Sequence, residues 1–545
     1  MNVAKAQLDY WKSLVYQLRI EFKFGLNWWT LVSLLLVSIV SAPILVVLAH
    51  IFYPPGETWN HLAATVLQDY AINSMILIVA VGAIALLLGV TTAWLVTTCD
   101  FPGRKFFSWA LILPISIPTY IAAYTYAGIF DFTGPVQNLL RSLFGGTLYF
   151  DIMTMEAIVF ILAFALYPYV YLISRAAFYR QSRTILEASR ILGKGPLTSF
   201  FKIALPLARP AIAGGVFLVV MEVLNDYGAV KYFGIPTFTT GIFRAWFSLG
   251  DPDAAIRLAT ILMLFVFLLM WLETKQRGKA KFSGNDTPFK PMQKFSLSKP
   301  KTIAACAACA IPFLFGFLIP VAQLISWSFQ TAGQVVNTEF LRLVLNSFML
   351  ALIASSLCVA VALFVVYAAR LNQSVLTQGL SRFAVLGYSI PGAVIAVGVL
   401  IPFNKIDQSV DRFMTTNFDI STGLILTGTL LAVTFAYLVR FLAISFNPIK
   451  AGFENMGTNL NEASLSLGTT PLKTLKKVNL PLVKGALLAA AILVFVDVLK
   501  ELPVTLILRP FNFDTLAIRA FELASDEMVA QSANAALIII LTSVL

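Results

Sequence analysis

Residues 187–206 read EASRILGKGPLTSFFKIALP, and residues 462–481 read EASLSLGTTPLKTLKKVNLP. Both stretches begin with Glu-Ala-Ser, place a glycine six residues after the glutamate and end in Leu-Pro. One offset relates all three landmarks (462 − 187 = 275). Both stretches are polar and basic within a very apolar chain. The repeat therefore predicts two equivalent docking elements on one side of a membrane and a two-fold partner on that side.

The composition identifies an integral membrane protein. Of the 545 residues, 59% are hydrophobic and 12% are charged, whereas soluble proteins carry roughly 25% charged residues. Because about 20 apolar residues span a bilayer as a helix, the sequence predicts six spans in each half. They are 30–52, 72–98, 106–130, 153–178, 211–228 and 255–273, then 302–328, 344–370, 382–404, 421–444, 484–508 and 530–545.

The repeat extends beyond the polar stretches and sets the domain boundaries. Asn73-Ser74 recurs as Asn346-Ser347, and Ile117-Pro118 recurs as Ile390-Pro391. Six spans per half give both halves the same orientation, as in a parallel repeat. We predict an all-α polytopic protein made of an amphipathic N-terminal segment, a first half, a basic linker and a second half. Their bounds are 1–29, 30–273, 274–301 and 302–545.

The distribution of lysine and arginine predicts the orientation. Segment 274–301 holds eight Lys/Arg against the single acid Asp286, and short loops rich in Lys/Arg face the cytoplasm. Counting spans from this linker places both termini and both Glu-Ala-Ser stretches in the cytoplasm. The net charge of +12 therefore reflects membrane topology, and no nucleic-acid partner is expected.

The glycines and prolines predict the local structure of each polar stretch. Gly193 and Gly468 permit a left-handed turn, and the proline three residues later suits the first turn of a helix. That helix is expected to end at the Leu-Pro pair, before the next span begins. The product is a short helix-turn-helix on the membrane surface.

This pattern resembles the EAA loop of bacterial ABC importer permeases of the type I fold. The resemblance implies a coupling helix that seats on an ATPase subunit, with Ser189 and Ser464 standing where the family often has a second alanine. The coupling residues that it implies are Glu187, Ala188, Ser189, Gly193, Leu205, Pro206, Glu462, Ala463, Ser464, Gly468, Leu480 and Pro481.

The resemblance also implies partners and a location. They are a homodimer of ABC ATPase subunits on the cytoplasmic side, an extracytoplasmic substrate-binding protein and the lipid bilayer of the bacterial inner membrane. The chain contains no GxxxxGK[ST] phosphate loop. We therefore expect no enzymatic activity and no cofactor bound by this chain, with ATP and Mg²⁺ held by the partner subunits.

Residues 221–251, MEVLNDYGAVKYFGIPTFTTGIFRAWFSLGD, resemble the corresponding segment of fused ferric-iron permeases. This resemblance implies import of ferric iron by alternating access. A fused permease for thiamine or another small solute is the alternative substrate class. An ion-gradient-driven secondary transporter is the alternative mechanism, although it gives no reason for two Glu-Ala-Ser stretches. A scaffold or channel leaves the acids described next unexplained.

Four carboxylates recur at the same 275-residue offset within predicted spans. A carboxylate in a membrane costs at least roughly 2.5 kcal/mol, so a symmetric set suggests a polar pathway and transient oxygen ligands for Fe(III). Spaced by four residues, each pair is expected to share one helix face. Alternatively, basic residues neutralise the acids, or the acids lie at the outer membrane edge. The pathway residues are Glu222, Asp226, Tyr227, Asp497 and Glu501, and the possible neutralising residues are Lys231, Arg244, Lys500 and Arg519.

Overall fold

The computed structural model of the chain is almost entirely helical. It describes residues 27–145, 150–180, 193, 195–277, 294–372, 374–457 and 459–544. Within these residues the strands are two short segments, Cys99–Asp100 (β1) and Phe295–Ser296 (β2), which pair in parallel.

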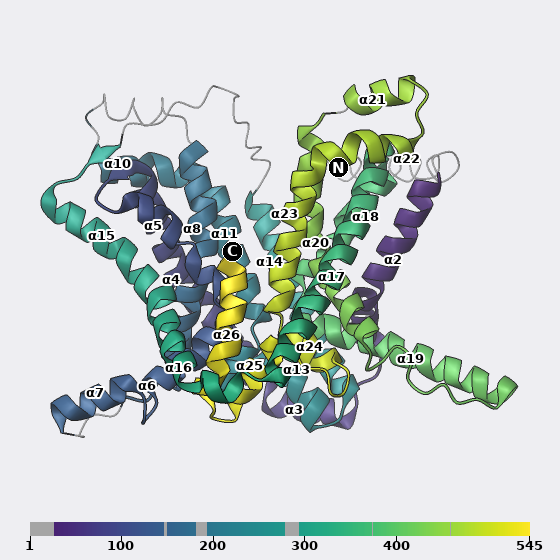
Figure 1. Cartoon of the computed structure of the whole chain (residues 1–545), viewed down its shortest axis with the longest axis horizontal. Helices are drawn as coiled ribbons and strands as arrows, with labels where there is room; N and C mark the ends of the chain where they lie inside the picture. Colours follow the sequence, from purple (N-terminus) through teal and green to yellow (C-terminus); the bar gives the residue numbers. More distant parts are fainter. Residues whose placement is uncertain are drawn as a thin grey trace, which may run out of the picture. The chain divides into compact units, whose positions relative to one another are not determined.

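The chain forms two compact units whose boundaries differ from those of the sequence halves (Figure 1). Unit 1 comprises Met1–Tyr53 and Arg342–Thr515, and unit 2 comprises Pro54–Leu341 and Leu516–Leu545. The first long helix of each sequence half thus packs with the following helices of the other half. The predicted linker at 274–301 separates the two copies of the sequence repeat and lies within unit 2. Its role as a domain boundary stays a prediction.

Unit 1 carries the first long helix of the chain and most of the second half. Its helices are α2 (Trp28–Ala49), η1 (His50–Phe52), α17 (Thr338–Leu371), α18 (Val375–Ala384), η6 (Leu386–Ser389), α19 (Gly392–Phe418), α20 (Leu430–Asn455), α21 (Asn459–Ser466), α22 (Pro471–Thr474), η7 (Leu475–Asn479), α23 (Leu480–Leu499) and α24 (Pro503–Leu508).

Unit 2 carries the remaining helices of the first half and both ends of the second. They are α3 (Glu57–Thr65), α4 (Leu67–Thr98), α5 (Arg104–Ala110), η2 (Leu113–Ser116), α6 (Thr119–Phe130), α7 (Pro135–Phe144), α8 (Met155–Arg180), α10 (Pro196–Ser199), η3 (Phe200–Ala204), α11 (Leu205–Asn225), α12 (Gly228–Tyr232), α13 (Phe238–Phe243), η4 (Arg244–Ser248), α14 (Pro252–Arg277), α15 (Lys299–Phe313), η5 (Leu314–Leu318), α16 (Ile319–Val335), α25 (Leu516–Ser525) and α26 (Val529–Val544).

Close helix packing depends on small residues in both units. In unit 2, a Cβ atom added to Gly89 of α4 would lie 2.6 Å from the Cβ of Val170 on α8. In unit 1, a Cβ atom added to Gly398 of α19 would lie 2.7 Å from the carbonyl oxygen of Pro43 on α2. Small residues at such crossings let membrane helices approach closely, where dispersion contacts stabilise the pair.

Most of the described helices overlap the predicted spans, but several predicted bounds are wrong. The predicted spans 211–228 and 484–508 run past the helix ends at Asn225 and Leu499, and 382–404 includes a break before α19 begins at Gly392. Among the described residues, ten helices are long and apolar enough to cross a membrane. The third expected span is instead a bent pair, with an angle of 93° between Arg104–Ser116 and Thr119–Phe144. The bend follows Pro118, which cannot donate a backbone hydrogen bond to continue the helix. The twelfth expected span is the shorter apolar helix Val529–Val544.

The prediction that Pro206 and Pro481 end the helices after the glycine turns is wrong. Each proline lies in the first turn of a long helix, α11 or α23, that follows directly on a π-helical segment. A π-turn is wider than an α-turn and changes the hydrogen-bond register. It therefore accommodates a proline without ending the helix, and each polar stretch continues into a membrane span.

Candidate functional site

The second Glu-Ala-Ser stretch forms a helix, a turn and a further helix in unit 1. Helix α21 ends at Ser466, and Gly468 adopts a φ of 78°. Ser464 is buried, and its hydroxyl lies 2.7 Å from Thr469 Oγ1 and 3.0 Å from Thr474 Oγ1. This cluster joins the two sides of the turn. The serine that stands in the alanine position therefore contributes hydrogen bonds as well as small size.

In the first stretch the structure describes Gly193 but not the residues on either side of it. Gly193 adopts a φ of 70°, in the left-handed region that favours glycine. The left-handed turns predicted at Gly193 and Gly468 are thus both confirmed. Glu187, Ala188 and Ser189 lie outside the described residues, so their placement stays a prediction.

The second stretch presents both charge and apolar surface away from the protein. Glu462 lies exposed in the first turn of α21, and Leu467 is 84% exposed next to the glycine turn. An exposed leucine beside a polar turn offers an anchor for another protein. Figure 1 shows α21 and α22 at one end of unit 1 and α24 at the other.

Asp226 does not lie on the helix that carries Glu222, contrary to the predicted shared face. Helix α11 ends at Asn225, and Asp226 has extended backbone. Its buried carboxylate accepts hydrogen bonds from the N–H groups of Ala229 and Val230 at 3.0 and 3.1 Å and from the hydroxyl of Thr119. Asp226 therefore caps the short helix α12 and joins it to α6.

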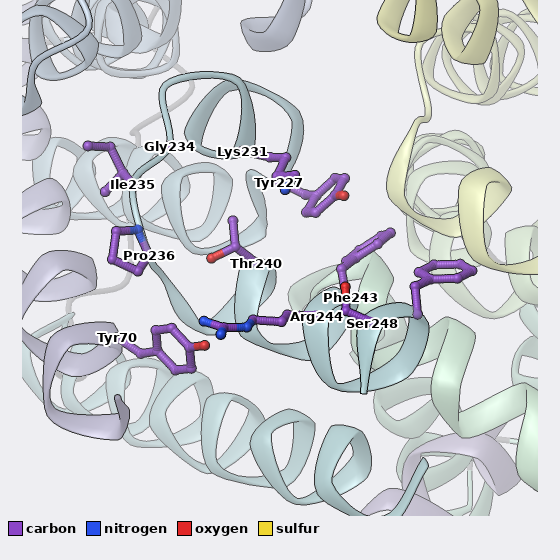
Figure 2. A pocket seen from close by; sticks show the side chains of 11 residues that line it. Tyr70, Tyr227, Lys231, Gly234, Ile235, Pro236, Thr240, Phe243, Arg244 and Ser248 are labelled. Carbon is purple, nitrogen blue, oxygen red and sulfur yellow. The ribbon is translucent and has the colours of Figure 1, made fainter. Parts of the chain in front are cut away.

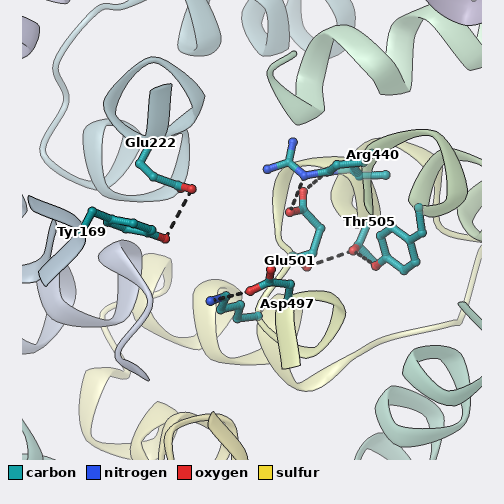
Figure 3. A network of polar contacts seen from close by, with 9 residues as sticks. Tyr169, Glu222, Arg440, Asp497, Glu501 and Thr505 are labelled. Carbon is teal, nitrogen blue, oxygen red and sulfur yellow. Dashed lines mark hydrogen bonds and ion pairs between the residues drawn. The ribbon is translucent and has the colours of Figure 1, made fainter. Parts of the chain in front are cut away.

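Glu501 has the equivalent position and the same structural role in unit 1. It follows the end of α23, so it too lies off the predicted helix face. One carboxylate oxygen accepts from the N–H of Val504 at 3.1 Å, which caps α24, and the other lies 3.1 Å from Nε of Arg440. Both charged side chains are over 90% buried, and their contact is drawn in Figure 3.

The carboxylates of Asp226 and Glu501, which cap the two short helices, have different side-chain partners. At an offset of 273, Gly392 corresponds to Thr119. A Cβ atom added to Gly392 would lie 2.4 Å from an Arg440 nitrogen and 2.9 Å from Glu501 Oε1. The missing side chain thus makes room for the guanidinium of Arg440 in unit 1, whereas a threonine hydroxyl serves the carboxylate in unit 2.

Glu222 and Asp497 are only partly buried, whereas Asp226 and Glu501 are buried. The hydroxyl of Tyr169 lies 3.4 Å from Glu222 Oε1 (Figure 3). Asp497 pairs with Lys500 at 2.7 Å, and both side chains of this pair are 24% exposed. Neutralisation by Lys500 is therefore confirmed for Asp497.

Arg440, the ion-pair partner of Glu501, is a residue of this site that the sequence interpretation missed. It lies in the apolar helix α20 and is 7% exposed. A buried arginine in a membrane span needs an acidic partner, so its presence within the predicted span 421–444 was the available signal.

The carboxylates do not form a metal cluster within the described residues. No group of three or more His, Cys, Asp or Glu there is arranged to hold a metal ion. Transient coordination of iron by Glu222, Asp226, Asp497 and Glu501 stays a prediction.

A cavity of about 550 Å³ lies in unit 2 beside the capped turn (Figure 2). Tyr227 lines it and stacks on Phe243, with ring centroids 3.6 Å apart. Lys231 and Arg244 also line it, and both are exposed. Neither forms an ion pair with a described residue, so the prediction that they neutralise the acids is not supported there. Tyr227, a predicted pathway residue, thus adjoins a basic cavity.

Comparison with known proteins identifies the family. The family model described as "Binding-protein-dependent transport system inner membrane component" matches residues 85–274 and 362–545. The chain belongs to this family. It is therefore a multi-pass inner-membrane component of a binding-protein-dependent transport system, and the two matched regions confirm two fused permease halves.

Individual relatives fall into two groups. The Fe(3+)-transport system permease protein FbpB 2 of Haemophilus influenzae is 29% identical over 86% of this chain and 87% of its own. The ferric transport system permease protein FbpB of Actinobacillus pleuropneumoniae is 24% identical over 85% and 69%. The molybdenum transport system permease protein ModB of Escherichia coli is 28% identical over 39% of this chain and 99% of its own.

The buried Arg440–Glu501 pair gives a stability prediction. Arg440→Gln leaves a buried, unpaired carboxylate, which costs about 3–5 kcal/mol, so the thermal melting temperature in detergent should fall sharply. Adding Glu501→Gln removes the unpaired charge and keeps an acceptor for the N–H of Val504, so this double variant should recover part of the lost stability.

The control is Lys500→Gln, in the partly exposed Asp497–Lys500 pair, which should change the stability by about 1 kcal/mol or less. Equal melting temperatures for Arg440→Gln and Lys500→Gln would contradict this role.

Proposed function

We propose that the chain is the permease of an ATP-driven importer of ferric iron, supplied by an extracytoplasmic binding protein. The single observation that carries the substrate is the match to the ferric permease FbpB 2 over most of both chains. The molybdenum permease, by contrast, matches only one permease half. The length of the ferric match favours the same fused architecture and the same cargo.

Two features support a pair of ATPase subunits as the energy source. The chain carries two glycine turns at one offset, and both have left-handed backbone. The exposed Leu467 and Glu462 give the second turn an apolar anchor and a charge for a partner. We infer that each stretch seats on one subunit of an ATPase homodimer, where ATP and Mg²⁺ are bound.

The proposed mechanism is alternating access. Closure of the ATPase pair on ATP moves both glycine turns, and the permease opens toward the binding protein. The span Phe200–Asn225 contains 26 residues, roughly 39 Å of helix. Glu222 in its last turn and Asp226 directly after it thus lie about a membrane thickness from the first glycine turn. With both turns and both termini in the cytoplasm, the carboxylates and the cavity face the extracytoplasmic side.

Within this mechanism, the four acids have different roles. The carboxylates of Asp226 and Glu501 already accept hydrogen bonds from N–H groups of α12 and α24. The side chains of Glu222 and Asp497 are more accessible. We infer that Glu222 provides negative charge for the cation in unit 2, because a trivalent ion entering a low-dielectric region has a very large desolvation cost. Asp497 pairs with Lys500 and provides its charge in unit 1 when a cation displaces that lysine. Asp226 and Glu501 each hold the turn after a long helix within their own unit.

Uptake by cells with and without this chain tests the substrate. Cells that contain the chain, its ATPase and its binding protein should accumulate radiolabelled ferric iron faster than cells without the chain. Thiamine and molybdate uptake should be equal in both strains. Equal iron uptake together with a difference in thiamine uptake would contradict the ferric assignment.

The glycine turns give a coupling prediction. Gly193→Val and Gly468→Val place a β-branched residue in left-handed backbone, which costs roughly 1–2 kcal/mol, although neither added Cβ would meet a neighbour. Iron transport should fall in each variant and further in the double variant, with normal membrane insertion. Gly195→Val is the matched control, because Gly195 also has open space and no positive φ. Normal transport with intact ATPase binding in the double variant would rule out the coupling role.

The acids give a separate prediction. Glu222→Gln with Asp497→Asn should abolish iron transport while ATPase binding stays intact. Asp226→Asn should transport normally, because asparagine keeps the oxygen that caps α12. If the Glu222/Asp497 double variant transports iron like the wild type, these acids are not part of the route.

A further inference from the structure

The cavity in unit 2 has an electrostatic character that does not suit a bare ferric ion. Lys231 of α12 and Arg244 of η4 are among the side chains that line it (Figure 2). None of its eleven described lining residues is acidic. Two fixed positive charges repel a trivalent cation, so the lining selects for negative charge.

The remaining lining groups also suit an oxyanion. Tyr70, Tyr227 and Ser248 bring hydroxyl groups to the same cavity, and these can donate to anionic oxygens. Lys231 and Arg244 would provide charge-assisted hydrogen bonds, and a guanidinium can bind a carboxylate or phosphate through two parallel bonds. The volume of about 550 Å³ lies within the usual range for small-ligand sites.

The fold itself does not require this pair of cations. At the 275-residue offset, Thr240 and Arg244 recur as Thr515 and Arg519, whereas Lys231 and Tyr227 are replaced by Leu506 and Leu502. The cap at the preceding carboxylate is nevertheless formed in both units. A structural role common to both halves therefore explains the arginine but leaves Lys231 and Tyr227 unexplained.

We propose that this cavity is an oxyanion-binding site, which takes a phosphate or carboxylate group. The inference rests on the proposed function only in one respect, that the oxyanion accompanies ferric iron as its ligand. Coordinated oxyanions offset the charge of the metal, so a chelated ion can approach a surface that a bare ion cannot. The site then acts on the ligand, while the carboxylate of Glu222 in the same unit acts on the metal.

Binding to the purified full-length chain in zwitterionic nanodiscs tests the site without iron. Radiolabelled phosphate and citrate are the probes, and at least one of them should bind saturably. Lys231→Gln with Arg244→Gln should weaken that binding about tenfold or more, since a hydrogen bond to a charged group contributes about one decade or more in affinity. Arg244→Lys, which keeps the charge, should retain part of it.

The matched control is Lys405→Gln with Arg412→Gln, which removes two exposed cations of α19 outside the cavity. This variant should bind both anions like the wild type. Absence of saturable binding by the wild type, or equal loss in the control, would overturn the proposal. So would unchanged anion binding with weakened attachment of the substrate-binding protein, which would make the face a docking surface.

A second arm separates the two sources of the oxyanion. Ferric citrate that binds more tightly than iron-free citrate, with the difference lost in the Lys231/Arg244 variant, supports an oxyanion carried on the metal. Equal affinity for the two forms overturns carriage on the metal and leaves a site for free anions. Failure of iron uptake in cells would contradict the proposed function without affecting anion binding by the purified chain.

Discussion

The satisfaction of backbone hydrogen bonds where membrane helices stop is the constraint on which this structure depends. Within a bilayer an unpaired N–H or C=O costs several kcal/mol, so breaks in helices survive only where protein groups replace the missing partners. Asp226 and Glu501 meet this need, since each follows a long helix. Asp226 accepts hydrogen bonds from two N–H groups of α12, and Glu501 accepts one from α24. The cavity in unit 2 lies beside one of these capped turns.

The two halves solve the same problem with different chemistry. Thr119 donates its hydroxyl to Asp226, whereas Gly392 leaves room for Arg440 to pair with Glu501. Among the described residues, the donors to Asp226 are therefore neutral, whereas Glu501 forms an ion pair. The basic cavity lies beside the turn at Asp226, which has no ion pair among the described residues. The two halves thus share the carboxylate that caps a short helix but differ in the charged residues around it.

The sequence predicted the repeated architecture well because hydropathy and a constant offset depend on local composition. The left-handed backbone at Gly193 and Gly468 followed from glycine's steric freedom. The exchange of first helices between units did not follow, because it depends on tertiary packing between distant segments. The ends of α11 and α23 were also missed. Gly228 and Pro503 begin the next short helices two residues after Asp226 and Glu501, but the breaks themselves depend on the tertiary partners of the two carboxylates. Pro206 and Pro481 were predicted to end helices but lie near the start of long ones. The π-turns before them allow this, and no short sequence motif encodes those turns.

The most direct test reconstitutes the purified chain with its ATPase in liposomes and adds the iron-loaded binding protein outside. Ferric iron should accumulate inside only when ATP is supplied to the ATPase side, and collapse of ion gradients with ionophores should leave the rate unchanged. Accumulation without ATP that follows an imposed ion gradient would contradict an ATP-driven permease.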